Sequence, residues 1–264
     1  MSLPYSTERF SLGRLLAISG RTYVRDFAIL MALAFVLRGA GLAAEGQLDA
    51  WMAADIARRP TAAIVPWLVG FFPFALADGA ITWTAVRRLA GRTPTLGGLG
   101  GLARLVGAFL AIDLVENVPT VIRICIPPSW LIVPSAPWLG EAVDLAYPII
   151  GGFWLALWLP ALAVAVAEQG SGAASLGRSL DLTRGYRWAL GVLCLGLQWL
   201  STALALLAAV GLAKAGFGGA PGWWAEFVTL PVWAFSSVTQ AAVYWELVRL
   251  KTGLSPAGDG SVFG

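Results

Sequence analysis

The strongest constraint on the fold of this chain is a series of six long, predominantly apolar stretches. They cover residues 27–44, 61–86, 102–126, 142–167, 188–213 and 226–250. A helix needs about 20 apolar residues to cross the hydrocarbon core of a bilayer, and each stretch is close to or above that length. Since hydrocarbon offers no hydrogen-bond partners, such stretches must satisfy their own backbone groups as helices. We therefore predict an all-α, polytopic membrane protein with six transmembrane helices.

The composition agrees with a chain that lies mostly in a membrane. Only 12% of the residues are charged, whereas 58% are hydrophobic. Soluble domains carry about 25% charged residues, so most of this chain should face lipid or other membrane helices. We expect a single membrane domain over residues 1–251 and a disordered tail over residues 252–264. The net charge of +3 provides no basic stripe that could bind nucleic acid.

The distribution of lysine and arginine predicts the orientation of the chain. Thirteen of these residues fall near the chain ends or in the second-to-third and fourth-to-fifth connections: Arg9, Arg14, Arg21, Arg25, Arg87, Arg88, Arg92, Arg104, Arg178, Arg184, Arg187, Arg249 and Lys251. Five lie toward the opposite side: Arg38, Arg58, Arg59, Arg123 and Lys214. Because positive residues concentrate on the cytoplasmic side, both termini are predicted to be cytoplasmic.

Several catalytic chemistries lack the residues that they require. The chain has no histidine, which excludes histidine-dependent general bases, Ser-His-Asp triads and histidine metal sites. Its two cysteines, Cys125 and Cys194, are too few for a disulfide framework or a CxxC metal site. We therefore expect no catalytic residues, no metal site and no cofactor.

Three segments on the predicted cytoplasmic side resemble one another. Residues 10–21, 94–104 and 174–184 each contain Ser or Thr, then Leu-Gly, leucines at helical spacing and an arginine. Ser11, Thr95 and Ser175 are predicted to cap amphipathic helices that lie at the lipid boundary. Two explanations remain open: three repeats of an interfacial helix plus a helical hairpin, or convergence among sequences that precede a membrane span.

The C-terminal half carries motifs that resemble a known family. These motifs are SLGRSLDLTRGYRW and QAAVYWELVRLKTG, and the segments FSLGRLLAISGRTYVRDF and ADGAITWTAVRRLAGRTPTL fit the same pattern. The chain resembles, over nearly its whole length, a bacterial membrane family known as the membrane domain of glycerophosphoryl diester phosphodiesterase. In fusions of that family, catalysis belongs to a separate soluble barrel that uses histidines. The resemblance therefore implies a stand-alone, non-enzymatic module of the bacterial inner membrane.

The clearest candidate site lies in the third stretch. Asp113, Glu116, Asn117 and Thr120 are spaced so that they share one face of a helix. Ionisable groups at membrane depth usually face the bundle interior or a water-filled cavity. Arg38 lies at a similar depth in the first stretch, and we predict that it pairs with Asp113 or Glu116. The site is then either a structural ion pair or part of a cavity for a proton, an ion or a lipid headgroup.

Other polar residues within the stretches have simpler interpretations. Asp78 is predicted to reach the inner interface near Arg87. The polar faces of the fifth and sixth stretches are predicted to serve helix packing: Gln198, Ser201, Thr202, Ser236, Ser237, Gln240 and Tyr244. Pro160 is predicted to kink the fourth stretch, and Gly151 and Gly152 to allow a close helix approach.

A second candidate site is a charged cluster at the predicted cytoplasmic face. It consists of Glu168, Arg178, Asp181, Arg184 and Arg187, and it coincides with the family-like motif. The arginines could bind anionic lipid headgroups or an acidic partner, or they could simply anchor the fifth stretch.

Two function classes follow from these patterns. The first is a lipid-associated scaffold or accessory module of the inner membrane, with membrane lipids and a larger membrane-protein complex as the expected partners. The second is a small transporter or channel that uses the acidic stripe of the third stretch.

Overall fold

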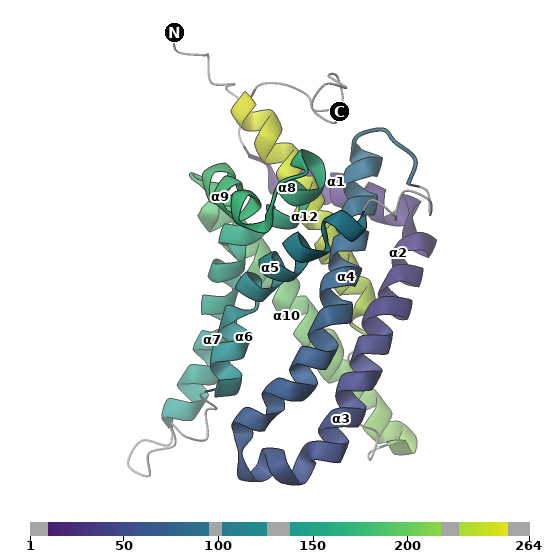
Figure 1. Cartoon of the computed structure of the whole chain (residues 1–264), viewed down its shortest axis with the longest axis vertical. Helices are drawn as coiled ribbons and strands as arrows, with labels where there is room; N and C mark the ends of the chain where they lie inside the picture. Colours follow the sequence, from purple (N-terminus) through teal and green to yellow (C-terminus); the bar gives the residue numbers. More distant parts are fainter. Residues whose placement is uncertain (1–9, 95–101, 126–137, 218–226, 253–264) are drawn as a thin grey trace.

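The computed structural model describes residues 10–94, 102–125, 138–217 and 227–252, and these residues form helices and turns with no β-strand among them (Figure 1). The predicted all-α class is therefore confirmed. Most helices run lengthwise, and the first helix lies at the same end of the molecule as the end of the last helix (Figure 1). Nearly all of the predicted tail, residues 252–264, lies outside the described residues.

Two of the three predicted interfacial segments form capped helices. The first is α1 (Leu12–Arg25), where the Arg14 N–H donates to Ser11 Oγ at 3.3 Å, which confirms the predicted cap. The second is α9 (Gly172–Thr183), which is capped by Ser171 one turn before the predicted Ser175. The helix starts earlier because two serines lie one turn apart, and Ser175 is instead buried against the bundle. Thr95 lies outside the described residues, and residues 102–104 form only a short 3-10 turn.

The N-terminal half contains one long helical hairpin. Its elements are α2 (Phe27–Leu33), the π-helical segment η1 (Ala34–Arg38), α3 (Gly39–Arg58), the 3-10 turn η2 (Pro60–Ala63) and α4 (Ile64–Leu89). The first arm is longer than the predicted stretch 27–44, because helical structure continues to Arg58. A Cβ on Gly70 would lie 2.1 Å from the Glu45 carboxylate, so this glycine allows α3 and α4 to approach closely.

The third predicted stretch is a broken helix. It consists of α5 (Val106–Glu116) and α6 (Val118–Cys125). Pro119 has no N–H, so the carbonyl of Val115 loses its usual partner one turn further on. The indole N–H of Trp154 donates to that carbonyl instead, at 2.8 Å. The carbonyl of Val115 therefore keeps a hydrogen-bond donor despite the break. The break also allows α5 to lie obliquely across the bundle (Figure 1).

The fourth predicted stretch is also broken, at the predicted position. It consists of α7 (Trp138–Trp158) and α8 (Ala161–Glu168), with Pro160 between them. The predicted close approach occurs at Gly152, where a Cβ would lie 2.9 Å from the side chain of Leu195 on α10 (Arg187–Leu212). A Cβ on Gly191 would lie 2.5 Å from the ring of Phe153, so both helices of this pair use glycine at their interface.

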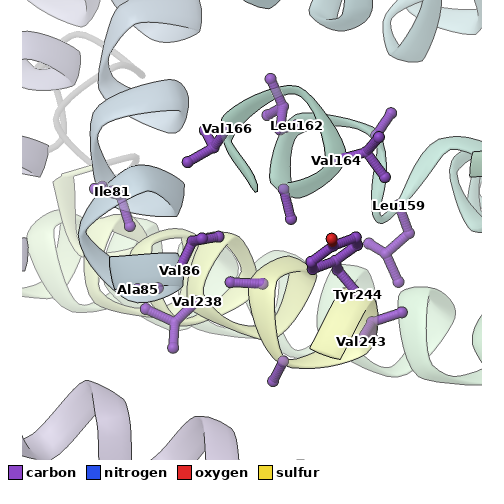
Figure 2. Packing of buried hydrophobic residues seen from close by; sticks show 14 of the residues in the cluster. Ile81, Ala85, Val86, Leu159, Leu162, Val164, Val166, Val238, Val243 and Tyr244 are labelled. Atoms are coloured by element: carbon purple, nitrogen blue, oxygen red, sulfur yellow. The ribbon is translucent and has the colours of Figure 1, made fainter. Parts of the chain in front are cut away.

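The core of the bundle forms around the last helix, α12 (Leu230–Thr252). Figure 2 shows its residues Val238, Val243 and Tyr244 in a cluster of buried apolar side chains to which α4 and α8 also contribute. Because protein surrounds α12, the helix can bury polar residues that lipid would not accept: Ser237, Thr239, Gln240 and Glu246. In Figure 1, α12 runs from the middle of the molecule to the end at which α1 lies.

Among the described residues, four helical stretches are long and apolar enough to cross a membrane. They are Phe27–Ile56, Thr61–Leu89, Ala146–Glu168 and Arg187–Gly216. This agrees with the predicted class of polytopic membrane protein but is fewer than the six predicted spans. The helices of the third predicted stretch, α5 and α6, carry three charged residues, Asp113, Glu116 and Arg123, and the helix of the sixth carries several polar residues.

Candidate functional site

Three carboxylates from two helices meet in the middle of the bundle. Asp78 comes from α4, and Asp113 and Glu116 come from α5; one oxygen from each of the three lies within 4.8 Å of the others. Asp113 and Glu116 share a helix face because they are three residues apart. Gly79 allows α5 to approach α4, since a Cβ at this position would lie 2.2 Å from the ring of Phe109. The glycine beside Asp78 therefore permits the acidic cluster to form.

The cluster is buried and largely without hydrogen-bond partners. Asp113 is 0% exposed and Asp78 is 2% exposed. Both oxygens of Asp113, Oδ1 of Asp78 and Oε1 of Glu116 are buried without a hydrogen-bond partner among the described residues. The remaining oxygen of Asp78 accepts from Nε2 of Gln240 at 3.4 Å, and Oε1 of Gln240 is itself unpartnered. Three buried side chains and the half-buried Glu116 thus present acceptor oxygens without partners to one region.

The predicted pairing of Arg38 with Asp113 or Glu116 is wrong. Nη1 of Arg38 lies 4.0 Å from Oε2 of Glu45, and its guanidinium lies over the Phe74 ring at 4.9 Å. Within the described part of the chain, no lysine or arginine forms an ion pair with the three clustered acids. Depth along straight helices predicts the pairing, but α5 packs against α4 at Gly79 and Phe109. Arg38 faces Glu45 and Phe74 instead.

The position of Asp78 differs from the prediction. It was predicted to reach the inner interface near Arg87, yet it lies inside the bundle beside Asp113. The sequence does contain a signal for the burial of Asp78, which is its depth in the helix. At about 1.5 Å per residue, Asp78 lies about 17 Å along α4 from Leu89 and about 21 Å from Ile64. A side chain that short cannot reach either interface.

A polar cavity of about 240 Å³ adjoins the acids. Its polar lining residues come from α4, α5, α6, α7, α10 and α12: Asp78, Glu116, Asn117, Thr120, Tyr147, Cys194, Gln198, Ser201, Ser236 and Gln240. The polar faces predicted to serve only packing in the fifth and sixth stretches therefore contribute Gln198, Ser201, Ser236 and Gln240 to one cavity. One water molecule needs roughly 10–15 Å³ of such space, so the cavity can hold a cation with several waters.

Asn117 and Thr120 hold the broken helix in place beside the cavity. The side-chain amide of Asn117 donates to the carbonyl of Asp113 at 2.9 Å. The hydroxyl of Thr120 lies 2.9 Å from the hydroxyl of Tyr147 on α7. Of the predicted stripe, Asp113 and Glu116 belong to the acidic cluster with Asp78. Asn117 and Thr120 instead form hydrogen bonds that stabilise the helices beside it.

The second predicted cluster is only partly assembled. Arg178 Nε lies 3.4 Å from Glu168 Oε1, and the Tyr244 hydroxyl donates to the same oxygen at 3.3 Å. Arg187 Nη2 donates to the Leu180 carbonyl at 3.3 Å, which ties the start of α10 to α9. This part of the cluster stabilises the contact between α8, α9 and α12.

Lys251 joins the remaining members of the second cluster at the end of α12. Its ammonium donates to the backbone carbonyl of Asp181. Burial lowers the pKa of Lys251, and the guanidinium groups of Arg178, Arg184 and Arg187 lower it further against the opposing effect of Asp181. Arg178, Asp181, Arg184 and Arg187 are all exposed, so they form a basic surface with one acid and not a pocket.

Two buried acids form ion pairs that were not predicted from the sequence. Glu246 is 1% exposed and pairs with Arg14 of α1 and with Arg249 one turn along α12. Asp26 is 4% exposed and accepts from Nε of Arg88 at 2.6 Å. The only signal in the sequence was the spacing of Glu246 and Arg249, because the other partners are far apart along the chain. These pairs anchor α1 and the start of α2 on the bundle.

Comparisons of the chain with models of protein families, with curated proteins and with solved structures find no match. The resemblance to the glycerophosphoryl diester phosphodiesterase membrane domain therefore stays a prediction, and the geometry of the acidic pocket carries the functional argument.

Proposed function

We propose that this protein is a small membrane transporter or channel that binds a cation in the pocket formed by Asp78, Asp113 and Glu116. The observation that carries this proposal is the grouping of three carboxylates, two buried and one half-buried, without a basic partner in the described part of the chain. Ionisable groups at membrane depth are expensive, and they usually mark ion or proton pathways. A protein that needed only packing at this position would be more stable with apolar residues.

Electrostatics require something positive in the cluster. Two full charges 4.8 Å apart repel by about 3 kcal/mol at an effective dielectric constant of about 20. The three carboxylates therefore cannot all be charged inside the bundle. Bound protons or a bound cation must neutralise them. A site that must bind positive charge to be stable is suited to cation translocation.

The broken helices beside the pocket also support a transport role. Secondary transporters commonly bind their ions near the bilayer midplane, where discontinuous helices expose backbone and side-chain polar groups. Here α5 ends at the cluster and α6 begins directly after Asn117. The α12 helix starts in the middle of the molecule and brings Gln240 to the same pocket (Figure 1).

Two further cavities adjoin the pocket and lead toward Arg38. A second cavity, of about 340 Å³, shares the lining residues Phe74, Ser201 and Trp233 with the first and reaches Arg38. A third, of about 70 Å³, shares Phe74 and Asn117 with the first and contains both Arg38 and Glu45. The three cavities share walls and together lie between the acids and the Arg38–Glu45 pair.

The proposed topology has six passes, with both termini in the cytoplasm of a bacterial cell and the protein in the inner membrane. In this arrangement the broken α5–α6 segment and the buried α12 helix count as the third and sixth passes. It is supported by the common location of α1 and the end of α12 and by the positive residues there: Arg14, Arg21, Arg25, Arg249 and Lys251.

A lipid-associated scaffold or accessory role is the second candidate. It is favoured by the amphipathic helices α1 and α9. The exposed side of α1 carries Arg21 and Arg25, and α9 carries Arg178 and is followed directly by the exposed Arg184. Such basic surfaces bind anionic lipid headgroups or an acidic partner in a membrane complex. This role leaves the acidic pocket without a purpose, so we place it second.

The test is cation flux into liposomes that contain the purified protein. Proton-sensitive and divalent-cation-sensitive dyes inside the vesicles report flux after a concentration gradient is applied. The double variant Asp113→Asn/Glu116→Gln keeps side-chain size but removes two charges, and its flux should fall at least about tenfold, the loss expected when a group near a bound ion changes. The matched control is Asp55→Asn, since Asp55 is an exposed acid on α3 far from the pocket.

Two results would decide against the transporter. Wild-type flux in the double variant, with helicity and gel-filtration behaviour unchanged, would show that the acids carry no transport. Absence of flux in the wild-type protein, together with a stable protein partner that co-purifies in mild detergent, would favour the scaffold.

A further inference from the structure

The spacing of the clustered carboxylates fits the ligand shell of a metal ion. Ca²⁺ binds oxygens at about 2.3–2.6 Å, so two ligands on opposite sides of the ion are separated by about 4.6–5.2 Å. The oxygens of Asp78, Asp113 and Glu116 lie within 4.8 Å of one another. One ion of this size can therefore contact all three with little movement. Mg²⁺, with ligands at about 2.0–2.1 Å, places opposite ligands only about 4.0–4.2 Å apart, so it requires a tighter cluster than Ca²⁺ does.

A neutral side-chain oxygen, Oε1 of Gln240, supports a bound metal ion independently of the three acids. Gln240 on α12 is 5% exposed, it lines the cavity, and its Oε1 has no hydrogen-bond partner among the described residues. Its Nε2 donates to Asp78, which orients the amide so that Oε1 is left for another ligand. Amide oxygens are typical ligands of Ca²⁺, and a buried acceptor without a partner is costly unless something binds it.

The charge of the cluster favours a divalent ion over a monovalent ion. Three carboxylates carry three negative charges when ionised, so a monovalent ion would leave two uncompensated charges in the bundle. A divalent ion leaves one, which a single shared proton cancels. The donor atoms are oxygens, with no histidine in the chain, and hard oxygen sets suit Mg²⁺, Ca²⁺ and Mn²⁺ better than softer metals.

From this geometry we infer that the pocket binds one divalent metal ion through the carboxylates of Asp78, Asp113 and Glu116 and the amide oxygen of Gln240. This inference rests on the proposed cation pocket and specifies the class of its ion. Because Asp78, Glu116 and Gln240 also line the cavity, water from the cavity can fill the remaining coordination positions.

The experiment measures binding directly, without flux. The protein is purified in detergent through a tag without histidines, because a polyhistidine tag would itself bind metal. MnCl₂ is then titrated, and free Mn²⁺ is followed by its electron paramagnetic resonance signal. We expect one Mn²⁺ per chain, displaced by CaCl₂ but not by the same concentration of NaCl.

Variants connect this binding to the named ligands. Affinity for Mn²⁺ should fall at least about tenfold in Asp113→Asn/Glu116→Gln and roughly tenfold in Gln240→Leu, and it should be unchanged in Asp55→Asn. CaCl₂ should also raise the unfolding temperature of the wild-type protein, a measurement that needs no variant.

Each outcome bears on a different proposal. Mn²⁺ binding that persists in the double variant, or equal displacement by Na⁺, would overturn the inference. Proton flux that depends on the acids, in a protein that binds no Mn²⁺, would overturn the inference and leave the transporter intact. Neither binding nor flux would reject both.

Discussion

The contact between Gly79 and Phe109 should control both the stability of the bundle and the assembly of the acidic cluster. An alanine Cβ at position 79 would lie 2.2 Å from Cδ2 of Phe109 and 2.7 Å from Cγ. Carbon atoms in contact lie about 3.5–4.0 Å apart, so the ring or the helix must retreat by more than about 1 Å. Phe109 is 1% exposed and has no open space to enter.

Overpacking of this kind costs about 1–3 kcal/mol. Gly79→Ala should therefore lower the unfolding temperature in detergent by roughly 3–10 °C, which intrinsic tryptophan fluorescence can follow in this tryptophan-rich chain. The same shift moves α5 away from α4, so it should also weaken Mn²⁺ binding by separating Asp78 from Asp113.

The control is Gly107→Ala on α5, where a Cβ would meet no atom within 4 Å. There alanine should be neutral or stabilise the helix by up to about 1 kcal/mol. In the double variant Gly79→Ala/Phe109→Leu, the smaller side chain relieves the overlap, so destabilisation should be less than the sum of the single effects. Equal unfolding temperatures for Gly79→Ala and the wild type would refute the close approach of α4 and α5.

Two further substitutions test the broken helix and the N-terminal anchor. Trp154→Phe removes the donor to the Val115 carbonyl and should destabilise the protein by about 1 kcal/mol in thermal unfolding, and an unchanged midpoint would mean that water replaces the indole. Arg88→Ala leaves the buried carboxylate of Asp26 without its guanidinium and should cost about 3 kcal/mol. Adding Asp26→Ala should recover part of that loss, and a purely additive double variant would show that the pair is not coupled.

The class of protein and the face of the acidic stripe could be predicted from the sequence because both depend on local patterns. Apolar length identifies membrane helices, and a spacing of three residues places Asp113 and Glu116 on one side of a helix. The kink at Pro160 and the cap at Ser11 are local in the same sense, since each depends on one residue and its immediate neighbours.

The partners of the acidic stripe could not be predicted in this way. Arg38 and Asp113 matched in depth along straight helices, but depth does not specify which helix face meets which neighbour. Asp78 lies in the site because Gly79 lets α4 and α5 touch. Gln240 lies there because α12 occupies the centre of the bundle. Such contacts join residues separated by 30 positions, as in Gly79 and Phe109, to 162 positions, as in Asp78 and Gln240.

The sequence by itself determined that the chain is helical, suited to a membrane, and supplied with carboxylates at depths where lipid cannot solvate them. The tertiary structure decided that these carboxylates meet one another and not an arginine. The physical reason is that hydrophobicity and helical periodicity act along the chain, whereas helix breaks and glycine contacts set the direction in which each helix turns toward its neighbours.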